Sequence, residues 1–205
     1  MEAHLQKTWI DFMQKSVHET GYWYYAFTSN NLAHLNSLQL SSWLIDFFKN
    51  DDQHLIYDFG CGNAYYLTEL HNKGIKNVIG IEPESPTKNS KFQILPYNLA
   101  FELPLTKKGN VISFEVAEHI PEKYQDVFIE NITKLCDNYL IISWAVEGQP
   151  GIGHVNCKNN EDVIPLFEQK GFTFQEKLTK EIKSKPTGMF GYFGNTLMIF
   201  KKNES

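Results

Sequence analysis

Hydrophobic positions follow a helical spacing before residue 50 and alternate between strand and helix patterns after it. Apolar residues recur every three or four positions over 1–20 and over 32–49, which predicts two amphipathic helices. Short apolar runs predict strands at 55–59, 77–82, 92–95, 110–114 and 139–145. Helical patterns follow at 63–73, 122–137 and 160–170. This alternation is typical of parallel strands joined by crossover helices, so it predicts an α/β fold.

The C-terminal part of the chain has a different pattern. The segments FTFQEKL and NTLMIFKK both resemble strands, and a segment containing Gly and Pro joins them without a helical pattern. Strands connected in this way are expected to pair antiparallel and to close the sheet. The chain has 205 residues and no repeat or linker, which predicts one domain.

The segment LIYDFGCGNAYYLTEL, residues 55–70, predicts a ligand-binding turn between a strand and a helix. Its apolar run ends at Asp58, and Gly60 and Gly62 follow. Glycines permit a tight turn and let a ligand approach the backbone N–H groups closely. About twenty residues later a second apolar run ends in Glu82, a spacing at which an acid binds the ribose of a nucleotide.

The amino-acid sequence of the turn distinguishes a dinucleotide cofactor from a cationic one. A dinucleotide fingerprint has a third glycine at the sixth position, and Tyr65 stands there. Asp58 would also repel a pyrophosphate, whereas it suits a cationic ligand. The segment DFGCGNA therefore resembles motif I of the class I S-adenosylmethionine-dependent methyltransferases, with Ala64 where that family usually has glycine.

This resemblance implies a fold and a cofactor site. The fold is a Rossmann-like, seven-stranded, mostly parallel sheet with a C-terminal antiparallel strand pair, in which 1–50 form a helical cap or lid and 51–205 the catalytic core. The resemblance places the methionine part of the cofactor at Asp58, Gly60, Cys61 and Gly62, and its ribose at Glu82. It places the adenine at Asn98, where the family commonly has Asp, and at Leu99. Glu115 follows the fourth strand and completes the expected cofactor-binding set.

Four further side chains are candidates for the chemistry. The segment NVISFEVAEHIP contains Glu115, Glu118 and His119, and the glycine-rich loop EGQPGIGHVN contains His154. Neighbouring strands precede the two segments, so these side chains are expected to meet. The pattern resembles the metal-dependent O-methyltransferases of ubiquinone biosynthesis and the small-RNA 2′-O-methyltransferases, which implies a site for Mg²⁺, Mn²⁺ or Zn²⁺. Without a metal, Glu118 would shape the pocket and His119 or His154 would act as a general base. A structural role for both histidines is the third interpretation.

Composition and charge indicate which kinds of partner and which cellular location are expected. The net charge is −5 and the basic residues are all lysine, which argues against a nucleic-acid partner. The three cysteines lack disulfide or metal spacing, and neither a signal peptide nor a membrane-spanning run is visible, so a cytoplasmic location is expected. The aromatic segment 22–27 is interpreted either as a packed cluster or as a lid over the cofactor sulfonium.

The sequence therefore favours an enzyme that methylates an oxygen or nitrogen of a small molecule. Three alternatives stay open at this point. They are an RNA 2′-O-methyltransferase that uses a metal, a non-catalytic cofactor-binding subunit, and a nicotinamide-dependent dehydrogenase, which Tyr65 disfavours.

Overall fold

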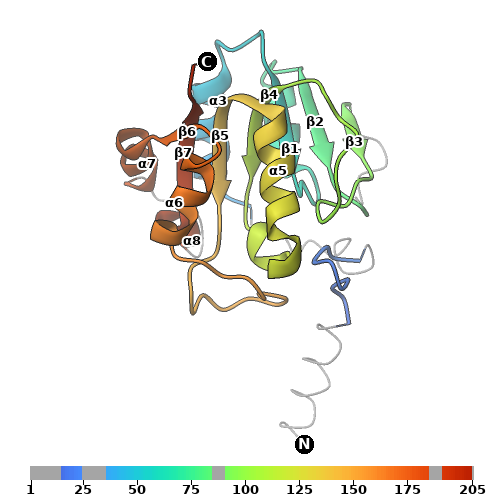
Figure 1. The fold of residues 1–205 in the computed structure, drawn as a ribbon. Helices are drawn as coiled ribbons and strands as arrows, with labels where there is room; N and C mark the ends of the chain where they lie inside the picture. The colour runs from blue at the N-terminus through green and yellow to red at the C-terminus, as the bar shows by residue number, and fades with distance from the viewer. Residues whose placement is uncertain (1–14, 25–35, 85–90, 185–190, 205) are drawn as a thin grey trace, which may run out of the picture.

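The protein is built around a single seven-stranded sheet, drawn in Figure 1. The computed structural model describes residues 15–24, 36–84, 91–184 and 191–204. The strand order is β3-β2-β1-β4-β5-β7-β6. The strands are β1 (Leu55–Phe59), β2 (Val78–Ile81), β3 (Gln93–Leu95), β4 (Gly109–Ser113), β5 (Cys136–Ser143), β6 (Phe172–Phe174) and β7 (Leu197–Lys202).

Strand direction matches the predicted α/β fold. Strands β1 to β5 pair in parallel, whereas β7 pairs antiparallel with both β5 and β6. The mostly parallel sheet with an antiparallel C-terminal pair is therefore confirmed. Every residue of β1 and β4 is buried, as expected for central strands covered on both faces.

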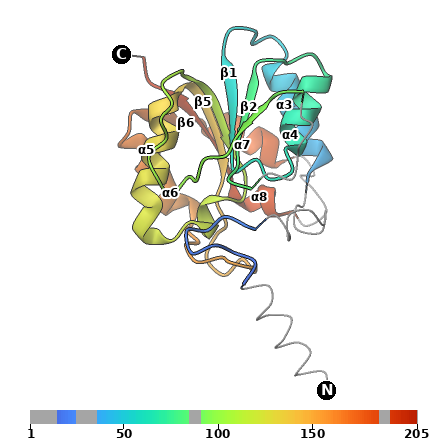
Figure 2. The ribbon, with the colours of Figure 1, turned by 90° about the vertical axis from the view of Figure 1, so that its right-hand side faces the viewer.

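Helices cover both faces of the sheet, as Figure 2 shows. The helices α5 (Gln125–Leu135) and α6 (Asn160–Glu168) lie on one face, and their apolar side chains form one core with the strands. The second core lies on the other face. It includes side chains from α3 (Leu38–Phe48), α4 (Tyr65–Asn72), α7 (Glu176–Lys183) and α8 (Tyr192–Thr196). Two short 3₁₀ turns, η1 (Ala117–His119) and η2 (Glu122–Tyr124), follow β4. None of the described helices is both long and apolar enough to span a membrane.

The C-terminal segment differs from its prediction. Strand β6 ends at Phe174, so the second half of FTFQEKL is not a strand, and α7 and α8 occupy the segment expected to lack a helix. Leu178 and Ile182 are four residues apart and pack on the second core, while Glu176 and Lys180 form an ion pair of 2.6 Å on the exposed side. The segment thus has a helical pattern that the neighbouring β-branched and aromatic residues concealed.

The N-terminal segment also departs from its prediction in part. The helix expected over 1–20 does not include 15–20, which form turns and an isolated bridge between Val17 and Trp23. Residues 1–14 lie outside the described part of the chain. Of the helix expected over 32–49, the described part begins at residue 36, and α3 starts after Ser37, whose Oγ caps the backbone N–H of Leu40.

Candidate active site

A cavity of about 670 Å³ opens at the carboxyl ends of β1, β2 and β4. Ligands bind at this edge in open α/β sheets. The eight residues predicted to bind a cofactor all line the cavity, and so do His119 and His154. Glu118 is fully buried behind its wall.

The glycine turn forms one wall of the cavity. The backbone N–H groups of Gly60 and Cys61 donate to the Ile81 carbonyl oxygen at 2.9 and 3.2 Å. The Gly62 N–H donates to Glu82 Oε2 at 3.0 Å, so the turn after β1 is tied to the acid after β2. Gly60 has a φ of 78°, and a Cβ there would lie 2.5 Å from the Val116 side chain. A side chain at residue 60 would therefore disrupt the turn.

Two buried carboxyl groups lie beneath this turn. Asp58 is 2 % exposed and Glu82 is 8 % exposed. Burial, reinforced by the Glu82 charge, raises the pKa of Asp58 to about 8. Burial also raises the pKa of Glu82 to about 7, against the lowering effect of the Gly62 hydrogen bond. Ionisation of these two buried carboxyls is therefore costly, and a cationic ligand would offset that cost.

Asp58→Asn is expected to raise the melting temperature increasingly as the pH rises from 5 to 8. In the wild type, the folded pKa of Asp58 lies above its unfolded value, so the folded state loses stability as the pH rises from about 4 to about 8. Asparagine removes that dependence, and each kcal/mol gained corresponds to roughly 2–4 °C in a chain of this size. Thermal unfolding of both proteins at four pH values tests this. A difference in melting temperature that does not change with pH would contradict the raised pKa of Asp58.

The predicted adenine-binding residues lie at a second wall. Asn98 Nδ2 donates to Thr20 Oγ1 at 2.8 Å, and Asn98 Oδ1 accepts from the Ala100 N–H at 3.0 Å. Leu99 is buried, and its carbonyl oxygen accepts from Asn131 Nδ2 at 3.2 Å. The contact between Thr20 and Asn98 joins the N-terminal segment to the loop after β3.

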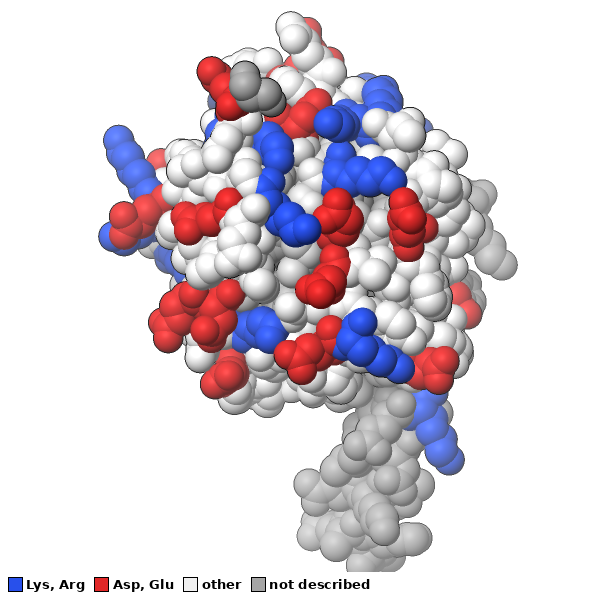
Figure 3. Space-filling model, viewed as in Figure 1, with Lys and Arg blue, Asp and Glu red and all other residues white. Residues whose placement is uncertain are grey.

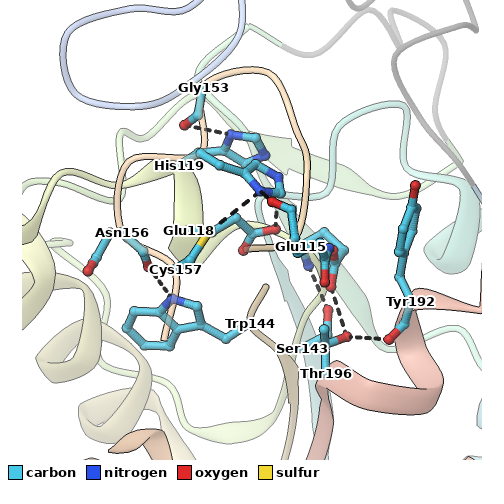
Figure 4. Close-up of polar contacts among 12 residues, drawn as sticks. Glu115, Glu118, His119, Ser143, Trp144, Gly153, Asn156, Cys157, Tyr192 and Thr196 are labelled. Carbon is cyan, nitrogen blue, oxygen red and sulfur yellow. Dashed lines mark hydrogen bonds and ion pairs between the residues drawn. The ribbon is translucent and has the colours of Figure 1, made fainter. Parts of the chain in front are cut away.

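Glu115 is held by three elements at once, as drawn in Figure 4. Its backbone adopts a φ of 52°, and its N–H donates to Ser143 Oγ at 2.7 Å. Gln149 Nε2 donates to Glu115 Oε2 at 2.7 Å, and Thr196 Oγ1 donates to Oε1 at 3.0 Å. Both carboxylate oxygens are thus occupied by hydrogen bonds, which fix the side chain at the cavity wall.

Glu118, His119 and His154 form a compact cluster. One donor atom from each lies within 4.8 Å of the others, and Glu115 is outside this group. His154 Nε2 is 3.9 Å from Glu118 Oε1, and the two imidazole centroids are 5.0 Å apart. Neither Glu118 oxygen has a hydrogen-bond partner among the described residues. The structure therefore brings together three of the four predicted metal ligands.

The loop that bears His154 is folded back onto Glu118. The Glu118 carbonyl oxygen accepts from the N–H groups of Val155 and Asn156 at 2.8 and 2.9 Å. Nδ1 of His119 lies 3.2 Å from the Gly153 carbonyl oxygen, and Nδ1 of His154 lies 3.1 Å from that of Gln149. With Nδ1 as the donor to these carbonyls, each ring keeps a lone pair on Nε2 for a proton or a metal.

Burial sets the charge of this cluster. It raises the pKa of Glu118 well above its usual value, with a contribution from Glu115, and lowers the pKa of His119 to about 3, with a contribution from His154. His119 is therefore neutral at pH 7 and a weak proton acceptor. Of the two histidines, His154 is the better candidate for a general base.

The N-terminal segment supplies wall residues that the pattern did not identify individually. Tyr22 and Trp23 line the cavity, while residues 25–27 of the aromatic segment lie outside the described residues. The Trp23 ring meets His119 edge to face at 5.4 Å. The sequence pattern also did not identify Gln149, which donates a hydrogen bond to Glu115. It lies in the same glycine-rich loop as the predicted residue His154.

Known proteins share the fold at low sequence identity. No family model matches the chain, and no curated protein matches it. Magnesium protoporphyrin IX methyltransferase from Synechocystis PCC 6803, solved with bound S-adenosylhomocysteine, has a TM-score of 0.59 and 18 % identity, covering 80 % of this chain and 83 % of that one.

Two further structures cover more of the chain. The 1,6-didemethyltoxoflavin-N1-methyltransferase of Burkholderia thailandensis has a TM-score of 0.64 and 11 % identity, covering 88 % of this chain and 84 % of that one. The (4+2) cyclase SpnF has a TM-score of 0.58 and 13 % identity, covering 93 % and 89 %. The chain therefore has the class I methyltransferase fold, which does not by itself determine the reaction.

Proposed function

We propose that this protein is an S-adenosylmethionine-dependent methyltransferase that methylates an oxygen or nitrogen of a small molecule. One observation carries the proposal: the Gly62 N–H bonds the Glu82 carboxylate, which ties the glycine turn to the acid suited to a ribose. The magnesium protoporphyrin and toxoflavin enzymes that share the fold are named as small-molecule methyltransferases, which supports the same class of acceptor here.

Different residues would bind the different parts of the cofactor. Asp58 and the turn from Gly60 to Gly62 would bind the methionine part, where the buried carboxyl favours the positive sulfonium ligand over a neutral one. Glu82 would accept hydrogen bonds from both ribose hydroxyls. Leu99 would pack on the adenine, and Asn98 Oδ1 has a second lone pair for its amino group.

In methyl transfer, the main role of the protein is to orient the acceptor and the methyl donor. When bound, S-adenosylmethionine would supply a methyl group that is activated by its sulfonium, and the acceptor atom would give up its proton to a base as the neutral thioether leaves. Alignment of the two reactants and exclusion of water supply most of the rate. His154 would take the proton, and Trp23 and the loop that bears His154 would exclude water.

The cluster of Glu118, His119 and His154 fits a divalent metal. Its buried carboxyl group has no hydrogen-bond partner among the described residues, and its two histidines have Nδ1 at backbone carbonyls, the arrangement of metal-binding imidazoles. These three residues would hold Mn²⁺, Zn²⁺ or Mg²⁺, with Glu115 beside them. When bound, such an ion lowers the pKa of an acceptor hydroxyl.

An RNA acceptor has less support. The net charge of −5 lacks a nucleic-acid footprint. On the face shown in Figure 3, lysines and acids alternate over the described residues, without a continuous basic stripe.

Equilibrium dialysis with radiolabelled S-adenosylmethionine tests the proposed cofactor. We expect saturable retention of label that excess S-adenosylhomocysteine abolishes and NAD⁺ leaves unchanged. Displacement by NAD⁺, or absence of retention, would contradict the proposal and return the dehydrogenase or a different ligand to consideration.

A further inference from the structure

Part of the cavity has an aromatic wall. Phe114, the residue after β4, contacts Tyr66 of α4 at a ring distance of 5.1 Å and Phe193 of α8 at 5.9 Å. Trp23 also lines the cavity, with its ring edge to face against His119. All of these side chains line the cavity, and they come from four separate elements. Such a wall suits a planar, apolar ligand.

The same cavity is rich in carboxyl groups. Asp58, Glu82 and Glu115 line it and Glu118 lies directly behind, whereas none of the described lining residues is a lysine. An anionic group on the acceptor would therefore have no ion-pair partner among the described lining residues and would meet carboxylates at short range.

Rotation of the Glu115 side chain would break two hydrogen bonds, one at each carboxyl oxygen. Gln149 holds one and Thr196 holds the other, and neither donor is a charged group. The Glu115 carboxyl group is thus held in one position at the cavity wall.

From these observations we infer that the methyl acceptor is a small aromatic alcohol or amine that carries no phosphate or carboxylate group. This inference rests on the proposed methyl-transfer function and gives its site a substrate class. Aromatic walls attract neutral rings and cations alike, so a positive substituent is compatible and a negative one is excluded. An RNA strand, with a phosphate on each nucleotide, falls outside this class.

A charge-matched series of probes tests the inference on the full chain. Naphthalene methanol, naphthylmethylamine and naphthoate share one ring system and differ in charge. Their dissociation constants would be measured by ligand-observed NMR on protein saturated with S-adenosylhomocysteine. We expect the alcohol and the amine to bind at least about tenfold more tightly than the carboxylate, the equivalent of about 1.4 kcal/mol.

Variants connect the binding to this cavity. Trp23→Ala is expected to weaken binding of the alcohol severalfold. Phe101→Ala, which removes an aromatic side chain that is 54 % exposed and outside the cavity, should leave it unchanged. Glu115→Gln keeps the shape and should reduce the discrimination against naphthoate.

Three results would overturn the inference. They are equal or tighter binding of naphthoate, no binding of any probe, and equal effects of Trp23→Ala and Phe101→Ala. Binding of S-adenosylhomocysteine is measured first. Its failure would contradict the proposed function, whereas its success with a reversed charge order would contradict the acceptor class alone.

Discussion

Replacing Glu82 by alanine is expected to weaken the binding of S-adenosylhomocysteine by roughly 100-fold or more. Each hydrogen bond from a ribose hydroxyl to a carboxylate contributes about 1.5–3 kcal/mol, and two would be lost together. The variant also removes the 3.0 Å bond that holds the Gly62 N–H. Isothermal titration calorimetry at pH 8 measures the change, because burial raises the pKa of Glu82 to about 7 and its carboxyl is ionised above that pH.

A matched variant separates this effect from a loss of fold. The Glu102 carboxyl is 82 % exposed and pairs with Lys134 at the surface, away from the cavity. Glu102→Ala should bind the ligand as the wild type does. Similar affinities for Glu82→Ala and Glu102→Ala would show that Glu82 does not bind the ribose.

Glu118→Gln is expected to abolish the stabilisation of the protein by Mn²⁺. If Glu118, His119 and His154 bind the ion, a concentration 100 times the dissociation constant adds about 2.7 kcal/mol to the wild type, or roughly 5–10 °C. Loss of the charged ligand should remove most of that shift. Without metal, the variant should melt no lower than the wild type, because it replaces a fully buried carboxyl that has no hydrogen-bond partner among the described residues.

The control for this variant is Glu122→Gln. Glu122 lies in the next turn of the chain, its side chain is 79 % exposed, and it pairs with Lys158 at 3.6 Å. It should respond to Mn²⁺ as the wild type does. If Mn²⁺, Zn²⁺ and Mg²⁺ all leave the melting temperature of the wild type unchanged, the proposed metal site is contradicted, and His154 stays the proposed general base.

The sheet was predictable because its strands are short apolar runs between recognisable turns. β1 is buried on both sides, and the glycines after it leave little choice of structure. The segment from 176 to 183 was harder, because its helical face consists of only two apolar residues among lysines and glutamates. Which of two weak patterns prevails depends on what the segment packs against, and sequence alone does not give that.

The site was predictable to the extent that strand ends determine it. Asp58 lies near the end of β1, and Glu82 and Glu115 follow β2 and β4, so the fold alone gathers them at one edge. Contacts between distant segments were not predictable. The bond from Asn98 to Thr20 spans 78 residues, and the position of Trp23 beside His119 depends on how the N-terminal segment turns back.

Calorimetric titration of the unmodified chain with S-adenosylhomocysteine tests the central claim most directly. The geometry of the glycine turn, Asp58 and Glu82 predicts saturable heat from one site per chain, with a dissociation constant on the order of micromolar. Absence of heat at pH 8 and across several temperatures would contradict the claim that this cavity is the site of a sulfonium nucleoside.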